Sequence, residues 1–165
     1  CVVLAVALAV LPLLDRSSKP IYLRLYPTKA ISFLEANGYR TKESRWVTQD
    51  WVGNYLECRY GTSARAFIDD RYDMYPEKVV TAYRNLLNGT GKTASIVDTY
   101  KPDVVIWERN QPFSNWLKGR LGWKQVFTDK KFVVFVRDDF KVSEKLEKLY
   151  SDRICQPEPN ESPIK

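Results

Sequence analysis

Along most of this chain, two patterns of hydrophobic and polar residues follow each other in turn. Short apolar runs, rich in β-branched and aromatic residues, predict strands. Between them, apolar residues spaced three or four apart predict helices. The predicted strands are 45–49, 64–69, 103–108, 124–128 and 132–137, and the predicted helices are 29–38, 50–61, 76–88, 93–100, 113–122 and 143–154.

The order of these elements predicts the fold class. Strands alternate with helices, which indicates an α/β layered sandwich with a mostly parallel sheet. The turn residues Asp129, Lys130 and Lys131 separate the last two strands and predict an antiparallel C-terminal hairpin. The run 103–108 is almost wholly apolar, as is typical of a strand covered on both faces. Asp50 is expected to cap the helix that it opens.

The two ends of the chain differ in character from its middle. Residues 1–14 are uncharged and apolar but shorter than the ~20 residues that cross a bilayer. We expect residues 1–16 to be the end of a transmembrane helix, and a buried core helix is the alternative. Residues 20–154 are predicted to form a single soluble α/β domain. The polar, Pro-rich residues 155–165 are predicted to be a disordered tail.

Composition narrows the possible functions. The chain has 165 residues, which suits one domain, and a net charge of +6. Its basic residues are scattered among acids, which favours a solvated surface and argues against a nucleic-acid partner. An anionic partner such as lipid headgroups is the alternative. Histidine is absent, which excludes Ser-His-Asp and Cys-His catalysis and histidine metal ligands.

The cysteines and a glycine-rich segment carry little chemistry. Cys1, Cys58 and Cys155 form no CxxC pair, which argues against zinc and thioredoxin-like chemistry. Cys58 and Cys155 could pair in an oxidising compartment, or each could be a small buried or half-buried apolar residue. The segment 89–93, GTGKT, lacks the first glycine and the preceding strand of a phosphate loop, so it is interpreted as a helix stop.

The segment 67–78, FIDDRYDMYPEK, is the best candidate site. Asp69, Asp70, Arg71 and Asp73 fall at the end of a predicted strand, and ligands of open parallel sheets bind beyond the carboxyl ends of strands. Carboxylates there could bind a divalent cation or act as acid and base. However, Asp beside Arg commonly fixes a loop, and Pro76 commonly opens a helix. The sequence alone favours the structural role.

The chain resembles the C-terminal soluble domain of polytopic membrane proteins related to the C-type glycosyltransferases. The resemblance covers residues 20–138. It is carried by the segments YPTKAISFLEANG, WVTQDWVGNYL, FIDDRYDMY, YKPDVVIWE and GWKQVFTDKKFVVFVR. Its most specific positions are Asp50, Trp51, Gly53, Tyr55 and Leu56, followed by Phe67, Ile68, Asp69, Arg71, Asp73 and Tyr75. Asn54 and Asp70 stand where the family usually has glycine, and the segment 47–49 differs from its usual Asn-Asp-Tyr-like run.

The resemblance implies an extracytoplasmic domain of a cell-membrane protein that uses polyprenyl-phosphate sugars. Its partners would be the membrane, its own upstream transmembrane domain and the polyprenyl-phosphate sugar. Catalysis would belong to the transmembrane part, so no catalytic residue is carried over to this chain. Asp69, Arg71, Asp73 and Tyr75 are carried over only as candidate substrate-binding positions. The chain itself would hold no cofactor, although the parent protein could require a divalent cation.

Two other functions remain open at this point. The chain could be a non-catalytic binding or assembly module of a membrane protein. It could also be a free-standing, metal-dependent enzyme built on the aspartates of the segment 67–78. The first alternative predicts few membrane spans upstream of the domain, and the second predicts that the domain alone binds a cation.

Overall fold

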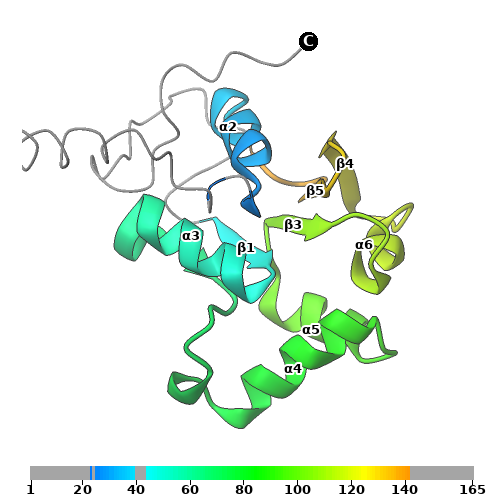
Figure 1. Ribbon diagram of the computed structural model, residues 1–165. Coiled ribbons are helices and arrows are strands. Elements are labelled where there is room, and N and C mark those ends of the chain that lie inside the picture. The colour runs from blue at the N-terminus through cyan, green and yellow to red at the C-terminus, as the bar shows by residue number, and fades with distance from the viewer. Residues whose placement is uncertain (1–22, 24, 40–43, 142–165) are drawn as a thin grey trace, which may run out of the picture.

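The fold is built on a five-stranded mixed sheet, seen in the computed structural model of the chain (Figure 1). The structure describes residues 23, 25–39 and 44–141. The strands are β1 (Arg45–Thr48), β2 (Arg65–Ala66), β3 (Val104–Glu108), β4 (Trp123–Thr128) and β5 (Phe132–Arg137). Their order is β2-β1-β3-β5-β4, with β2, β1 and β3 parallel, and β5 antiparallel to both β3 and β4. The predicted α/β class and the C-terminal hairpin are therefore confirmed.

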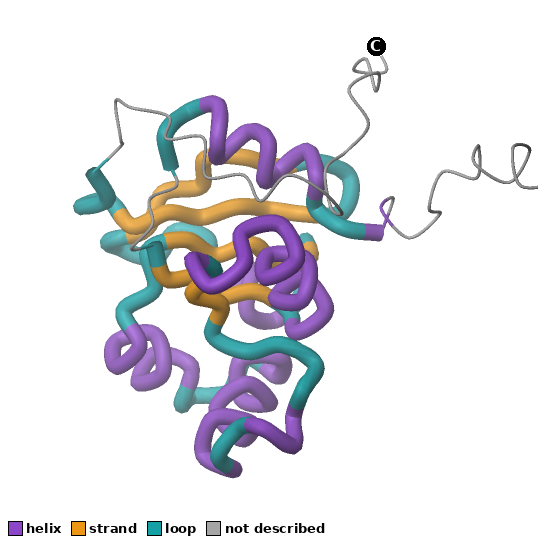
Figure 2. The backbone as a smooth tube through the Cα atoms, turned by 90° about the vertical axis from the view of Figure 1, so that its left-hand side faces the viewer, coloured by secondary structure: helices purple, strands orange, loops and turns teal. Residues whose placement is uncertain are grey.

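Helices cover both faces of this sheet (Figure 2). The helices are α2 (Thr28–Ala36), α3 (Asp50–Tyr60), α4 (Glu77–Asn88), α5 (Thr93–Tyr100) and α6 (Pro112–Leu117), and the short 3-10 turns are η3 (Gly61–Ser63) and η4 (Tyr72–Met74). α2 and α3 pack on one face, and α4, α5 and α6 pack on the other. Because β3 lies between both layers, Val104 and Ile106 face one core while Val105 and Trp107 face the other.

The end of α4 explains the segment GTGKT. Gly89 caps the helix in the left-handed conformation with φ 58°, which glycine adopts without strain. A side chain at Gly89 would also meet Pro112, because an added Cβ would lie 2.6 Å from the Pro112 Cβ. The segment is thus a helix stop held against the start of α6, as predicted, and not a phosphate loop.

Several predicted boundaries are wrong. The predicted strand 64–69 shortens to β2, because the chain leaves the sheet after Phe67 donates a backbone hydrogen bond to the Trp46 carbonyl at 2.8 Å. The helix predicted at 113–122 ends at Leu117. Asp50 is the first residue of α3 and not its N-cap, which is Gln49.

Part of the prediction falls outside the described residues. The expected transmembrane end at 1–16, the predicted helix at 143–154 and the tail at 155–165 all lie there. Within the described ranges, no helix has both the length and the apolar character needed to cross a membrane.

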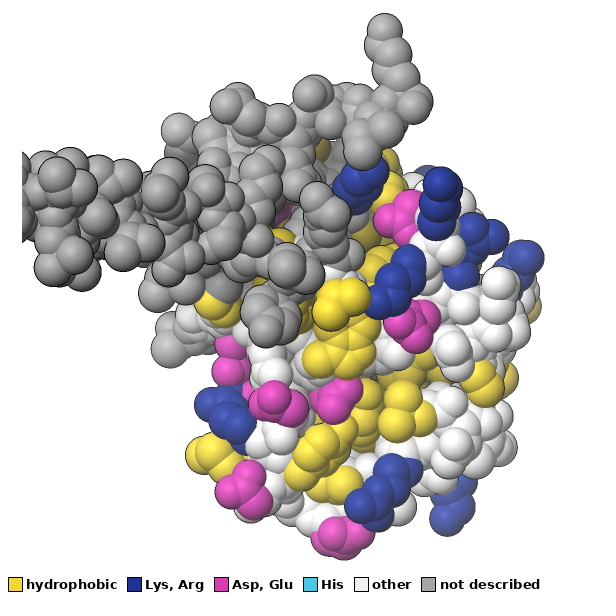
Figure 3. Space-filling view, in the orientation of Figure 1, with side chains coloured by type: hydrophobic (Ala, Val, Ile, Leu, Met, Phe, Trp, Pro, Cys, Tyr) yellow, Lys and Arg dark blue, Asp and Glu magenta, His cyan; other side chains and the backbone are white. Residues whose placement is uncertain are grey.

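The surface carries charges of both signs. On the face turned to the viewer in Figure 3, lysine and arginine side chains are dispersed among acidic and apolar ones. This dispersal follows the sequence, in which basic residues are interleaved with acids along the chain.

Candidate functional site

The candidate site lies at the edge of the sheet where the parallel strands end, here called the carboxyl edge. Asp50 follows β1, Asp69 follows β2, and Glu108 is the last residue of β3. Parallel strands bring their carboxyl ends to a common edge, so the topology gathers residues that are far apart in sequence.

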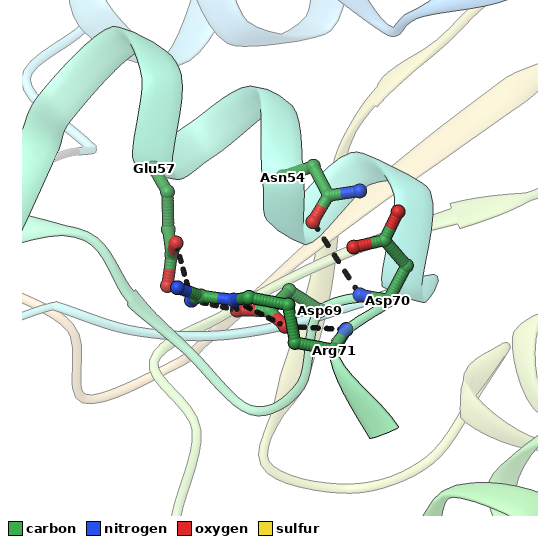
Figure 4. A network of polar contacts seen from close by, with 5 residues as sticks. All are labelled: Asn54, Glu57, Asp69, Asp70 and Arg71. Atoms are coloured by element: carbon green, nitrogen blue, oxygen red, sulfur yellow. Dashed lines mark hydrogen bonds and ion pairs between the residues drawn. The ribbon is translucent and has the colours of Figure 1, made fainter. Parts of the chain in front are cut away.

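Asp69 is a buried carboxylate held by Arg71. The Arg71 Nε donates to both carboxylate oxygens of Asp69 at 3.1 Å, its Nη2 donates to Oδ2, and its backbone N–H donates to Oδ1 at 2.9 Å (Figure 4). Asp69 is 0% exposed, and the hydrogen bonds from Arg71 hold the pKa of its carboxyl below the usual range despite burial. The pair fixes a tight loop directly after β2.

Glu57 completes this ion-pair network from α3. Its Oε2 lies 2.6 Å from the Arg71 Nη2, so one guanidinium joins two carboxylates (Figure 4). Burial, and then the neighbouring Asp69, raises the pKa of Glu57. Sequence reasoning missed Glu57, although it lies one helical turn after Gly53 and therefore on the same face of α3.

Gly53 lets α3 approach the loop closely. A Cβ built on Gly53 would lie less than 3.0 Å from the Ile68 carbonyl oxygen, closer than real Cβ atoms come. The next residue, Asn54, accepts a hydrogen bond from the Asp70 backbone N–H at 3.4 Å (Figure 4). Asn54 and Asp70, which stand where the resembled proteins usually have glycine, thus contact each other. Among described non-glycine residues only Lys101 and Asn110 have positive φ, so Asp70 does not need glycine's freedom.

Asp50 ties the start of α3 to two other elements. Its carboxylate accepts hydrogen bonds from the Tyr83 hydroxyl at 2.8 Å and from the Tyr72 hydroxyl at 2.6 Å. The Tyr83 hydroxyl also accepts the Asp50 backbone N–H at 3.0 Å. Burial raises the pKa of both phenols, so both remain donors at neutral pH. This tether, and not helix capping, is the role of Asp50.

The aromatic motif positions belong to packing. Tyr55 is 3% exposed and its ring stacks on Tyr26 at a centroid distance of 4.9 Å. Trp51 is half-buried, and its ring lies 5.5 Å from Tyr26 and 5.8 Å from Phe132. These rings join α3 to the segment before α2 and to β5.

The remaining candidate residues have different environments. Tyr75 is half-buried, and its hydroxyl helps to lower the pKa of the Asp69 carboxyl. Asp73 lies on the exposed turn η4. The structure therefore brings Asp69, Arg71 and Tyr75 together, whereas the Asp73 side chain faces solvent.

The chemistry available to this network is limited. The Asp69 carboxylate is buried and bonded to Arg71, and the Arg71 guanidinium already contacts two carboxylates. Within the described part of the chain, no group of three or more cysteine, aspartate or glutamate side chains could hold a metal ion. The arrangement is therefore suited to fixing a loop.

Cys58 on α3 is a disulfide-bonded cysteine. Its side chain is exposed and takes part in a disulfide. The two other cysteines of the chain, Cys1 and Cys155, lie outside the described residues. Of the two alternatives for Cys58, a paired cysteine fits and a buried apolar residue does not.

Comparisons with known proteins assign neither a family nor a function to this chain. The chain matches no family model, and no curated protein or solved structure is significantly similar to it. A functional proposal rests on the geometry above and on the motif resemblance.

Proposed function

We propose that this chain is an accessory extracytoplasmic domain of an integral-membrane, glycosyltransferase-like protein. In this proposal it aids substrate binding, while catalysis belongs to the transmembrane part of the parent protein. The observation that carries the proposal is the contact between the two most specific motif segments. Gly53, in the first segment, packs on Ile68 and Asp69, in the second. The motif therefore encodes one structural unit at the carboxyl edge.

The internal bonding of the acidic residues favours an accessory role. Asp69 and Glu57 share Arg71, and Asp50 accepts hydrogen bonds from two tyrosines. A catalytic acid or base must reach a substrate proton within hydrogen-bond distance, and Asp69 is fully buried. Arg71, with half of its side chain exposed, and the exposed Asp73 are the members of this loop that a substrate could touch.

The disulfide at Cys58 supports the proposed location. Disulfides persist in oxidising compartments and are rare in the cytosol. A disulfide-bonded cysteine on α3 is therefore in keeping with a domain on the extracytoplasmic side of a cell membrane.

The path of the chain at the carboxyl edge supports a membrane partner. The Leu25 carbonyl accepts a hydrogen bond from the Lys131 ammonium at 3.3 Å, and Lys131 lies in the turn that bonds to Arg109 at the end of β3. Leu25, which comes after the apolar residues 1–14 in the sequence, thus packs at this edge. Leu25 is 56% exposed and Met74 is 71% exposed.

Sugar transfer by the full-length parent protein is the direct test. Membranes that contain it would be assayed for transfer from polyprenyl-phosphate sugars, alongside membranes with Arg71→Ala and a form that lacks this domain. We expect transfer by the parent, a higher KM for Arg71→Ala and no transfer by this chain alone. A parent protein with few membrane spans and no transfer would instead support the alternative, a binding or assembly module.

Radical footprinting of the chain in lipid nanodiscs tests the membrane-facing edge. Met74, the chain's one methionine, and Leu121, at the opposite edge of the sheet, are 71% and 95% exposed. We expect lipid to protect Met74 from oxidation several-fold while Leu121 reacts as its exposure predicts. Each position is compared with itself with and without lipid, and a Met74 oxidation rate that lipid leaves unchanged would contradict the orientation.

A further inference from the structure

A separate feature of the carboxyl edge lies between β1 and β3. From β1 the chain passes through α3 to β2 on one side, and from β3 it passes through α6 to the hairpin on the other. α3 and α6 pack on opposite faces of the sheet. In open α/β sheets, ligands bind outside the carboxyl ends of two neighbouring strands whose connections diverge in this way.

Three polar side chains and one indole ring meet at this point, beside the end of β1. The Gln49 Nε2 donates to the Glu108 Oε2 at 3.3 Å, which joins the ends of β1 and β3. The Lys131 Nζ lies 3.3 Å from the other Glu108 oxygen and 4.8 Å from the centroid of the Trp51 ring. With Thr48, the last residue of β1, these residues are called the switch-point cluster.

Two buried polar atoms of the cluster lack a hydrogen-bond partner among the described residues. They are the Thr48 Oγ1 and the Gln49 Oε1. Thr48 is 0% exposed and Gln49 is 8% exposed, and buried polar atoms in native proteins are nearly always bonded. The Gln49 amide cannot be turned to relieve this, because its NH₂ donates to Glu108, a carboxylate that only accepts.

The charged members of the cluster remain accessible. The Glu108 side chain is 26% exposed and the Lys131 side chain is 44% exposed. Lys131 covers the Trp51 ring and also donates to the Leu25 carbonyl at 3.3 Å, so its flexible side chain uncovers that ring only by leaving these contacts. A ligand can thereby reach the indole face and the carboxylate together.

We propose that the switch-point cluster binds a neutral, hydroxyl-rich ring of the sugar class. The Gln49 Oε1 and the Glu108 carboxylate accept ligand hydroxyls, the Thr48 hydroxyl donates or accepts, and the apolar face of the ring packs on Trp51. A single carboxylate supplies too few oxygen ligands for a divalent cation, and its negative charge disfavours a simple anion. Assigning this sugar to the parent protein's substrate rests on the proposed function, whereas binding itself does not.

The test measures glycoside binding to the full 165-residue chain. Methyl pyranosides of glucose, galactose and mannose would be titrated in micelles of a detergent without a sugar headgroup, with saturation-transfer NMR as the readout. We expect saturable binding of at least one glycoside. Glu108→Gln and Trp51→Phe should each weaken it by about tenfold, the effect of losing one strong contact. The exposed acid Glu77 supplies the control, and Glu77→Gln should bind as the unaltered chain does.

Thr48→Val separates a ligand role from a purely structural one. Valine replaces an unpartnered buried hydroxyl with a methyl group, so we expect a higher Tm together with weaker glycoside binding. The inference is overturned if no glycoside binds saturably, or if Glu108→Gln, Trp51→Phe and Thr48→Val all bind normally. Glycoside binding without sugar transfer by the parent would uphold this site and refute the proposed function, and the reverse result would do the opposite.

Discussion

Among single residues, Gly53 decides how closely α3 approaches the Asp69 loop. Alanine is the better helix former by about 1 kcal/mol, but its methyl group would collide with the Ile68 carbonyl. Because that neighbour is backbone, we expect Gly53→Ala to lower the free energy of unfolding by about 2 kcal/mol, measured by urea denaturation. Gly91→Ala is the matched control, since a Cβ there meets nothing within 4 Å. Equal stability of the two variants would refute the close approach.

The buried Asp69 should make the domain sensitive to acid. Its pKa is lowered in the folded state, so the stabilisation is present at neutral pH and is lost as the pH falls below about 4, the unfolded value. Asp69→Asn should therefore flatten the dependence of unfolding free energy on pH between about 4 and 2. The exposed Asp73 provides the comparison, and Asp73→Asn should leave the slope unchanged. A steep acid transition in Asp69→Asn would show that other groups cause it.

The ionisation of Glu57 should change the pH dependence of the unfolding free energy in the direction opposite to that of Asp69. Because burial raises its pKa, its protonation favours the folded state, and this contribution is present in acid and lost as the pH rises through the folded pKa. We expect Glu57→Gln to make the unfolding free energy less dependent on pH at mildly acidic values, measured by urea denaturation across that range. An unchanged profile would contradict the coupling of Glu57 to Asp69.

At the scale of elements, Tyr83 connects α4 to the start of α3. Its hydroxyl donates to the Asp50 carboxylate and accepts the Asp50 backbone N–H. Tyr83→Phe leaves both Asp50 groups without this partner, so we expect a loss of about 1–2 kcal/mol in thermal unfolding. Tyr72→Phe removes an exposed hydrogen bond to the same carboxylate and should cost less. A larger loss for Tyr72→Phe would reverse the assigned roles.

An element can be predicted from the sequence when the residues that determine it lie within its own segment. β3, α5 and the hairpin were predictable, because an apolar run, a helical period and a three-residue turn are encoded within each segment. β2 was overpredicted, because its end is set by the approach of α3 to Ile68, far away in sequence. Glu57 was missed for the same reason, because its partner Arg71 is 14 residues away in the sequence. The switch-point cluster was missed because Gln49, Glu108 and Lys131 meet only once the strands are ordered.

For the whole molecule, the carboxyl edge unites the proposed roles. The Asp69 loop, the switch-point cluster and the segment at Leu25 all lie there, although they come from distant parts of the chain. In the proposed function, a ligand bound at this edge would be presented to the membrane part of the parent protein. A domain that positions a membrane-bound substrate requires this arrangement.

The disulfide of Cys58 allows the placement of the whole chain to be tested. Of its possible partners, Cys1 falls in the predicted transmembrane end, so we predict that peptide mapping without reductant finds Cys58 linked to Cys155. A link across about 100 residues is worth about 4–5 kcal/mol in the chain-entropy model, so reduction or Cys58→Ser should lower the free energy of unfolding markedly. Protein from the membrane fraction should carry the linked peptide, whereas protein held in a reducing cytosol should carry free thiols. Free Cys58 in the membrane-derived protein would argue against an extracytoplasmic location.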